Sequence, residues 1–378
     1  MKEKNSFQLP KGMRDLLPAE ARAKRKLENC LINKFLSWGY EEVATPALEY
    51  YENLRPAETP EDQFFKLVDR EGQILALRTD MTTPIARMTA NHFSPADYPL
   101  KFFYLTRVFR YENIQMGRQR EFYQGGVEFI GSKGAAADGE VIALAVETLK
   151  ESGLADFQIS LGHRDFLRGI IDQLKLDEED ELEVLKAVWK KDYVKLETIL
   201  NRVQAASDIK EVILLLPTLR GDISVIHQAS KVTNNPTSQA ALENLAEIYR
   251  LLQVFGVEQH VFIDFGIVRD FDYYSGIIFE GYSPKVGAPI LGGGRYDDLL
   301  SHYGAPAPAT GFAIGLERLM LALGETEHDS DVLDYLVICQ DWAAGIKKAQ
   351  ELRRSGFRVR TAFSKKETLP QAKEVIEL

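Results

Sequence analysis

The spacing of hydrophobic positions changes several times along the chain, and each change predicts a different element. Apolar residues recur at helical spacing between residues 19 and 38, including Leu27, Leu31 and Phe35, and Gly39 is suited to end that helix. Shorter apolar runs bounded by turn residues follow, which is typical of strands. We expect strands at 42–46, 64–69, 74–78, 101–110 and 121–130, and helices at 81–90 and 136–152.

The pattern becomes helical again from about residue 166 to 256. Leu182, Leu185, Val188 and Trp189 are spaced as on one face of a helix, with charged residues between them. Charge interleaved at helical period usually marks a solvated face. This stretch therefore predicts a helical insertion, exposed to solvent, on a core built from a sheet.

Strand patterns return after the insertion and divide the rest of the chain into two parts. The first part carries expected strands at 261–265, 275–280 and 288–291 and a helix at 316–323. The second reads as a strand at 335–339, a helix at 343–355, a strand at 358–362 and a helical tail, which is one βαβ unit. We expect an α+β fold with one domain over 1–325, interrupted by the insertion, and a small α/β unit over 326–378.

Composition narrows the possible functions. The chain has 46 Lys and Arg against 56 Asp and Glu, so its net charge of −10 makes it a poor general binder of nucleic acid. Its two cysteines form no CxxC pair, so we expect no zinc site and no other metal site. The first residues lack an apolar core, and no run of about 18 apolar residues occurs, so we expect a cytoplasmic protein without a membrane span.

Two polar segments in the first part of the chain are candidates for ligand binding. The hairpin that contains Arg110, Glu112 and Gln124 suits bidentate binding of phosphate or carboxylate, although an ordinary charged surface hairpin would look the same. Asp80 and Thr82 stand at an expected helix start, where a plain N-cap is the alternative.

Two further segments lie after the insertion. Arg269 stands beside Asp270, Asp272, Tyr273 and Tyr274. If these charged side chains are buried, they need partners, because an unpaired buried charge is costly. The partners could belong to a ligand, and an internal salt bridge is the alternative. The glycine run at 292–294, and Gly311 and Gly315 before Arg318, would allow close approach of a ligand to the backbone.

These segments together resemble the class II aminoacyl-tRNA synthetase core, specifically histidyl-tRNA synthetase. The motifs are KGMRDLLP, FRYENIQMGRQREFYQGGVEFIG, RDFDYYSGIIFE, GGGRYDDLL and GFAIGLERL, and they cover residues 8–165 and 257–325. The resemblance implies an antiparallel sheet flanked by helices, with a C-terminal remnant of an anticodon-binding domain. It also implies ATP-like positions at Arg110 near the α-phosphate, Glu112 near adenine and Arg318 near the γ-phosphate.

The same resemblance implies a pocket for histidine. Arg269 and Arg110 match arginines beside the α-phosphate and the amino-acid carboxylate. Asp80 and Thr82 match positions that hold the α-ammonium group, with Gln124 nearby. Glu128 and Tyr274 match positions around the imidazole, and Tyr273 belongs to the same expected pocket; a carboxylate and a phenol can satisfy both ring nitrogens.

Several departures from the synthetase pattern point to a related family. Asp80 stands where the synthetase has glutamate, Met81 where glycine is usual, and Asp270 follows Arg269 where glycine is usual. After Leu323 we expect only one βαβ unit in place of a full anticodon-binding domain. With LRTDMTTPIAR and Leu161-Gly162-His163, the chain is similar to the regulatory subunits of ATP phosphoribosyltransferase.

That resemblance implies a subunit with no catalytic residues and no cofactor, in a hetero-octamer of four plus four with a short-form catalytic subunit. It also implies histidine as a feedback effector and no binding of tRNA. The alternatives left open are an active histidyl-tRNA synthetase or histidine-adenylating enzyme, and a synthetase-like regulator of an RNA or kinase-type partner.

Overall fold

The computed structural model describes residues 8–55, 59–112, 119–267, 273–324, 332–364 and 370–378. The contacts between Cα atoms divide the chain into two compact units. The first consists of Met1–Asp15 and Ala23–Leu323, and the second of Leu16–Arg22 and Gly324–Leu378.

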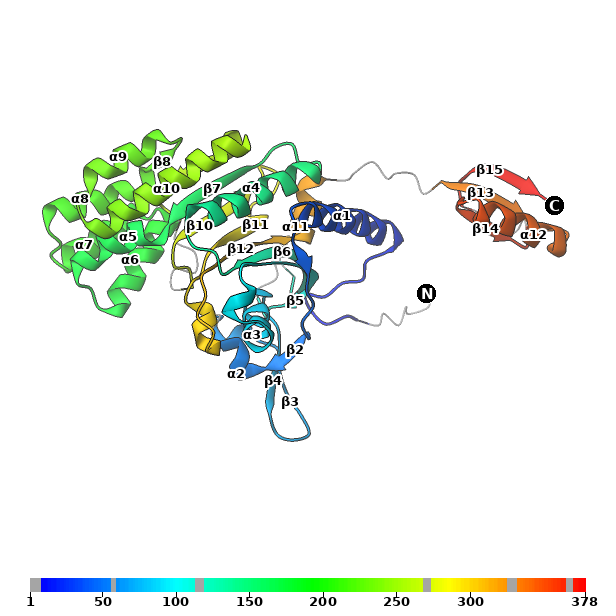
Figure 1. The fold of residues 1–378 in the computed structure, drawn as a ribbon, viewed down its shortest axis with the longest axis horizontal. Coiled ribbons are helices and arrows are strands. Elements are labelled where there is room, and N and C mark those ends of the chain that lie inside the picture. Colours follow the sequence, from blue (N-terminus) through cyan, green and yellow to red (C-terminus); the bar gives the residue numbers. More distant parts are fainter. Residues whose placement is uncertain (1–7, 56–58, 113–118, 268–272, 325–331, 365–369) are drawn as a thin grey trace, which may run out of the picture. The chain divides into compact units, whose positions relative to one another are not determined.

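A nine-stranded sheet is the centre of the first unit (Figure 1). Among the described residues its strands pair antiparallel except β1 with β5 and β7 with β9, so the sheet is mixed, and the expected antiparallel pairing is found in the other six pairs of neighbouring strands. In sheet order the strands are β1 (Glu41–Glu42), β5 (Leu100–Phe109), β6 (Glu121–Ile130), β12 (Ala309–Gly315), β11 (Leu291–Arg295), β10 (Ile277–Tyr282), β7 (Gln158–His163), β9 (Val261–Asp264) and β8 (Arg220–Gly221).

The two faces of this sheet support different helices, as Figure 1 shows. Successive residues of a strand point to opposite faces. Phe103 therefore packs in the main core with α4 (Ala135–Glu151), whereas Phe102 and Tyr104 pack in a second cluster with α3 (Thr82–His92). The second face carries the polar residues described below.

The predicted insertion is helical, but it is not a separate solvated appendage. Val184, Leu185 and Val188 are buried in the same continuous core as α4, whereas Leu182 and Trp189 are 50% and 57% exposed. The apolar stripe is therefore rotated from the one expected, and it packs onto the sheet domain. The helices are α5 (Arg164–Ile171), α6 (Glu178–Lys190), α7 (Tyr193–Arg202), α8 (Ser207–Leu215), α9 (Ser224–Val232) and α10 (Pro236–Phe255).

The glycine run forms a strand in the middle of the sheet. The strand expected at 288–291 lies instead at β11, which contains Gly292, Gly293 and Gly294. Its partner β12 and the more distant β7 were not expected as strands at all. Glycine is rare inside strands, and it marks sites where another group approaches the backbone closely.

Two small sheets complete the fold. In the first unit, β2 (Leu48–Tyr50), β4 (Ile74–Leu77) and β3 (Lys66–Val68) form an antiparallel sheet. In the second unit, β14 (Val359–Ala362), β13 (Leu333–Ile338) and β15 (Ala372–Glu377) form a parallel sheet with α12 (Trp342–Arg354). The expected helical tail was wrong: pairing with β13 makes this segment a strand.

A buried ion pair ties β11 to α4 behind the site. Arg295 Nη2 lies 2.8 Å from Asp138 Oδ1, and the two side chains are 8% and 1% exposed. The same guanidinium donates to the carbonyls of Ser132 and Gly134 and lies 3.0 Å from Asp297. The charge is thus fully surrounded by acceptors, which a buried cation requires.

Arg295→Ala is expected to lower the free energy of unfolding by about 3–5 kcal/mol, because it leaves Asp138 buried without its cation. Urea unfolding measures the change. Arg202→Ala is the control, since Arg202 is 55% exposed where it pairs with Asp180 and Glu183, and its loss should cost less than about 1 kcal/mol. Equal losses in the two variants would contradict a structural role for the buried pair.

Candidate functional site

A fully buried carboxyl group is the centre of the candidate site. Glu128, on β6, is 2% exposed, and among the described residues it has no cation as a hydrogen-bond partner. Thr82 Oγ1, at the start of α3, donates to Glu128 Oε1 at 2.8 Å, and the phenol of Tyr296 donates to Oε2. Burial raises the pKa of the Glu128 carboxyl to about 8, although both hydrogen bonds oppose the rise.

Glycines make room for this carboxyl and for an aromatic ring beside it. Gly294, Gly311 and Glu128 are direct neighbours across β11, β12 and β6. A Cβ atom at Gly311 would collide with the Glu128 carboxylate, and one at Gly294 would collide with the ring of Tyr274. The two glycines therefore set the depth of the site.

Three tyrosines form one wall. The Tyr273 ring stacks on Tyr296 at 5.7 Å between centroids and meets Tyr274 edge-on at 5.1 Å. Burial raises the pKa of the Tyr273 phenol well above its usual value, and the charges of Asp80 and Glu128 add to the rise. Burial and Glu128 do the same for Tyr296. These phenols therefore remain neutral hydrogen-bond donors.

Asp80 is only partly available to a ligand. Its Oδ1 accepts the backbone N–H of Thr83 at 3.0 Å, and its Oδ2 accepts the hydroxyl of Thr79 at 3.1 Å. The helix-capping alternative is thus part of its role. Met81 is 1% exposed in the second cluster, so it serves the core rather than the site.

The β5–β6 hairpin contributes two polar atoms without partners. Arg110 Nη2 donates to the Thr79 carbonyl at 3.0 Å, and Nη1 lies 3.4 Å from Glu112 Oε1. Arg110 Nε and Gln124 Oε1 are buried, and neither has a hydrogen-bond partner among the described residues. Buried polar atoms are nearly always paired, so these two are candidate contacts for a polar ligand.

Two expected site residues are not brought into this group by the described structure. Arg269 lies outside the described residues. Arg318, on α11 (Leu316–Leu323), donates to the Pro289 carbonyl at 2.7 Å, and among the described residues no hydrogen bond or ion pair joins it to Arg110 or Glu128.

The described part of the chain has neither a metal-binding cluster nor a membrane-spanning helix. No group of three or more His, Cys, Asp or Glu side chains is arranged to hold a metal ion. No helix there is both long and apolar enough to cross a membrane.

Residues 12–319 match the family model described as histidyl-tRNA synthetase. The "ATP phosphoribosyltransferase regulatory subunit" of Moorella thermoacetica is 46% identical over 93% of this chain and 91% of its own length. That of Desulforamulus reducens is 44% identical over 94% and 90%. The chain belongs to the family of ATP phosphoribosyltransferase regulatory subunits.

Solved structures agree with this assignment. A Bacillus halodurans protein described as an ATP phosphoribosyltransferase regulatory subunit/histidyl-tRNA synthetase superposes with a TM-score of 0.87 at 32% identity, over 98% of both chains. Histidyl-tRNA synthetase from Nostoc superposes with a TM-score of 0.82 at 23% identity, over 97% of this chain and 88% of its own. The class II synthetase fold expected from the motifs is therefore confirmed, and this regulatory-subunit family shares it.

Tyr296 is a site residue that was not predicted from the sequence. It lies in the motif GGGRYDDLL, but no role was expected for it, and the phenol beside Glu128 was expected to be that of Tyr274. Tyr296 directly follows β11, and this strand was not predicted at its true position because glycines carry no strand signal. The position of Tyr296 next to Glu128 therefore depends on the order of the strands in the sheet, which the sequence does not give.

The raised pKa of Glu128 predicts a pH-dependent stability. The folded pKa of about 8 lies above the usual glutamate pKa of 4.5, so this group's contribution to stability is complete below about pH 4.5 and is lost as the pH rises through about 8. Wild-type protein should therefore lose a few kcal/mol relative to Glu128→Gln between about pH 5 and pH 8. Urea unfolding of both proteins across this range measures the difference; a pH-independent difference would contradict the shifted pKa.

Proposed function

We propose that this chain is a non-catalytic regulatory subunit that assembles with a short-form ATP phosphoribosyltransferase, four copies of each, and that histidine is its effector. The family assignment supports the regulatory role. The observation that supports histidine as the ligand is the buried Glu128 carboxyl, which has hydroxyl partners and an aromatic wall but no cation bonded to it in the described part of the chain.

The chemistry of the site fits an imidazole. With a pKa of about 8, Glu128 is largely protonated near neutral pH, and it can either donate to a ring nitrogen or accept from one. The neutral phenol of Tyr273 offers a further donor, whereas that of Tyr296 already donates to Glu128, and the rings of both provide an apolar wall. If Glu128 instead loses its proton, its negative charge would stabilise an imidazolium. The pocket can therefore accommodate both the neutral and the protonated imidazole ring.

The rest of the amino acid has candidate partners nearby. Arg110 Nε is an unused buried donor for a carboxylate, and Gln124 Oε1 is an unused buried acceptor for an ammonium group. Asp80 would share the ammonium while it keeps its bonds to Thr79 and Thr83. Arg269 is proposed for the same pocket on the strength of the motif alone.

An active synthetase would need free groups for ATP at the positions of Arg110, Glu112 and Arg318. Arg110 is instead bonded to Thr79 and Glu112, and Arg318 to Pro289. These contacts favour a pocket for the amino acid over one for the triphosphate. Feedback then requires that histidine bind one state of the complex better than another, by about 1–3 kcal/mol.

Mixing the chain with a short-form ATP phosphoribosyltransferase should give a co-eluting complex with increased turnover, and histidine should inhibit that complex. Size-exclusion chromatography with light scattering and a turnover assay measure both effects. The chain alone should not exchange labelled pyrophosphate into ATP in the presence of histidine. Robust exchange would contradict the non-catalytic role, and failure to co-elute would contradict the assembly.

Glu128→Ala should weaken histidine binding by about 1–3 kcal/mol, because the imidazole loses a buried partner. Isothermal titration calorimetry on the purified chain measures the change. Arg107→Ala is the control, since Arg107 lies on the same hairpin but is 53% exposed where it pairs with Glu121. If Glu128→Ala binds histidine as tightly as the control, the effector site lies elsewhere.

A further inference from the structure

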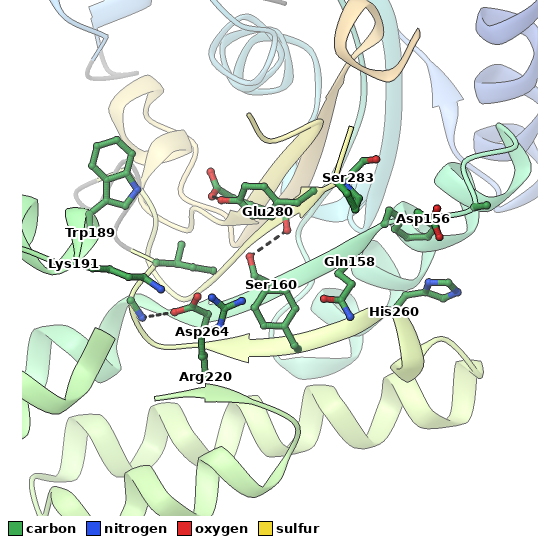
Figure 2. A pocket seen from close by; sticks show the side chains of 17 residues that line it. Asp156, Gln158, Ser160, Trp189, Lys191, Arg220, His260, Asp264, Glu280 and Ser283 are labelled. Carbon is green, nitrogen blue, oxygen red and sulfur yellow. Dashed lines mark hydrogen bonds between the residues drawn. The ribbon is translucent and has the colours of Figure 1, made fainter. Parts of the chain in front are cut away.

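A cavity of about 760 Å³ lies between the sheet and the helical insertion (Figure 2). Asp156, Asp264 and Glu280 line it together with Lys191 and Arg220, so acidic and basic side chains face the same space. The charges in this cavity therefore favour neither an anion nor a cation. A feature that does specify its partner lies in the second unit, at the edge of its small sheet.

The small sheet of the second unit has β13 in its middle, between β14 and β15, and Figure 1 shows α12 beside these strands. Among the described residues, β15 therefore has a strand partner on one side only. Four of its six residues are exposed, and Val375 is 52% exposed. An open strand edge of this kind can pair with a strand of another chain.

The pairing of β15 with β13 determines which of its backbone groups point to the open edge. Leu378, directly after β15, donates its N–H to the Ile338 carbonyl on β13 at 3.0 Å. The N–H and C=O groups of successive strand residues point to opposite edges of the strand. The backbone groups of Lys373, Val375 and Glu377 therefore point away from β13, to the outer edge.

One register of β15 with a second copy of itself matches both these backbone groups and the charges. When the two strands run antiparallel with Val375 opposite its own counterpart, Lys373 lies opposite Glu377 of the second copy, and Glu377 lies opposite Lys373. The backbone groups that point outward then meet in hydrogen-bonded pairs. A shift by two residues in either direction would also match the backbone groups, but it would place no lysine opposite a glutamate.

The charges of β15 restrict the strands with which it can pair. Charged side chains, lysine above all, protect edge strands against unspecific pairing. Lys373 Nζ lies 2.8 Å from Asp334 Oδ1 on β13, yet the lysine side chain is 69% exposed, so it can also face a second carboxylate across the open edge. In the register above, Lys373 lies between Asp334 and Glu377 of the second copy. Directly opposed opposite charges stabilise a strand pair and like charges destabilise it, so this edge is complementary to its own copy.

We propose that β15 pairs antiparallel with β15 of a second copy of this chain, and that the two small sheets thereby become one continuous sheet. The contact is two-fold symmetric, so it closes on itself and occupies the open edge of β15 in both copies. Hydrogen bonds of the main chain supply the affinity, and the pairs of Lys373 with Glu377 fix the register. This contact is independent of the histidine pocket and of the proposed regulatory role.

Disulfide trapping in the full chain, measured by non-reducing gel electrophoresis, tests this register. All variants carry Cys30→Ser, so that the remaining native cysteine, Cys339, is buried. Val375→Cys should give a disulfide-linked dimer on mild oxidation, because opposite residues of a hydrogen-bonded antiparallel pair have Cα atoms about 5.5 Å apart, within reach of a disulfide. Lys373→Cys is the matched control on the same face of β15. It should cross-link about fivefold less or weaker still, because at about 3.4 Å per residue it lies about 14 Å from its own counterpart.

A mixture of Lys373→Cys and Glu377→Cys should form the mixed dimer, since these two residues are opposed in the register. Adding Val375→Pro to both proteins should lower the yield of that dimer by about fivefold or more, because proline removes an N–H that points to the outer edge. The melting temperature should stay unchanged, since the pairing of β15 with β13 does not use that N–H.

Charge reversal tests the ion pairs separately. Adding Glu377→Lys to Val375→Cys should lower the yield of dimer by about fivefold, because it places a lysine opposite Lys373. Glu374→Lys is the matched control, since Glu374 is also exposed on β15 but lies opposite Ile376 of the second copy, and it should leave the yield unchanged. Absence of a Val375→Cys dimer, or equal cross-linking of Val375→Cys and Lys373→Cys, would overturn the proposal.

Discussion

The candidate site depends on the absence of side chains at two positions in the middle of the sheet. Glu128 can be buried only because Gly311, its direct neighbour on β12, has no Cβ atom, and Tyr274 can lie over β11 only because Gly294 has none. Strands with glycine are intrinsically weak. The buried Arg295–Asp138 pair, which holds the end of β11 against α4, offsets this weakness next to the site.

The sequence predicted correctly those helices and strands whose spacing of apolar residues matches the side of the element that is buried in the fold. The helix at 316–323 has the expected ends, and the strands at 101–110 and 121–130 agree with β5 and β6 to within one residue, because their apolar runs are long. β11 was misplaced because glycines carry no strand signal. The segment Ala372–Glu377 reads AKEVIE, without the strict alternation that marks a strand, and its pairing with β13 decides that it is one.

The candidate site was predictable to the extent that its residues lie in continuous motifs. Thr82 and Glu128 were expected in one pocket, and they share a hydrogen bond although 46 positions separate them. Tyr296 was not expected beside them, because its position depends on the order of β11, β12 and β6 in the sheet. No local spacing encodes that order. The same reason applies to the cavity under the insertion, whose walls come from strands and helices that are distant in the sequence.

The hydrogen bonds of Glu128 suggest how a ligand in the pocket would change the conformation of other parts of the chain. Thr82 is the first residue of α3, and Tyr296 follows β11 directly, so one carboxyl joins a helix start to a strand end. An imidazole nitrogen that accepts the proton of Glu128 can be added to these two bonds, whereas an imidazole N–H that donates to Glu128 competes with Thr82 or Tyr296 for a carboxyl oxygen. The displaced hydroxyl then needs a new partner, because a buried polar group without one is costly. Under the proposed function, a ligand that displaces either hydroxyl would favour a second arrangement of α3 and the segment after β11, and a protein partner that contacts only one arrangement would respond to the ligand without touching it.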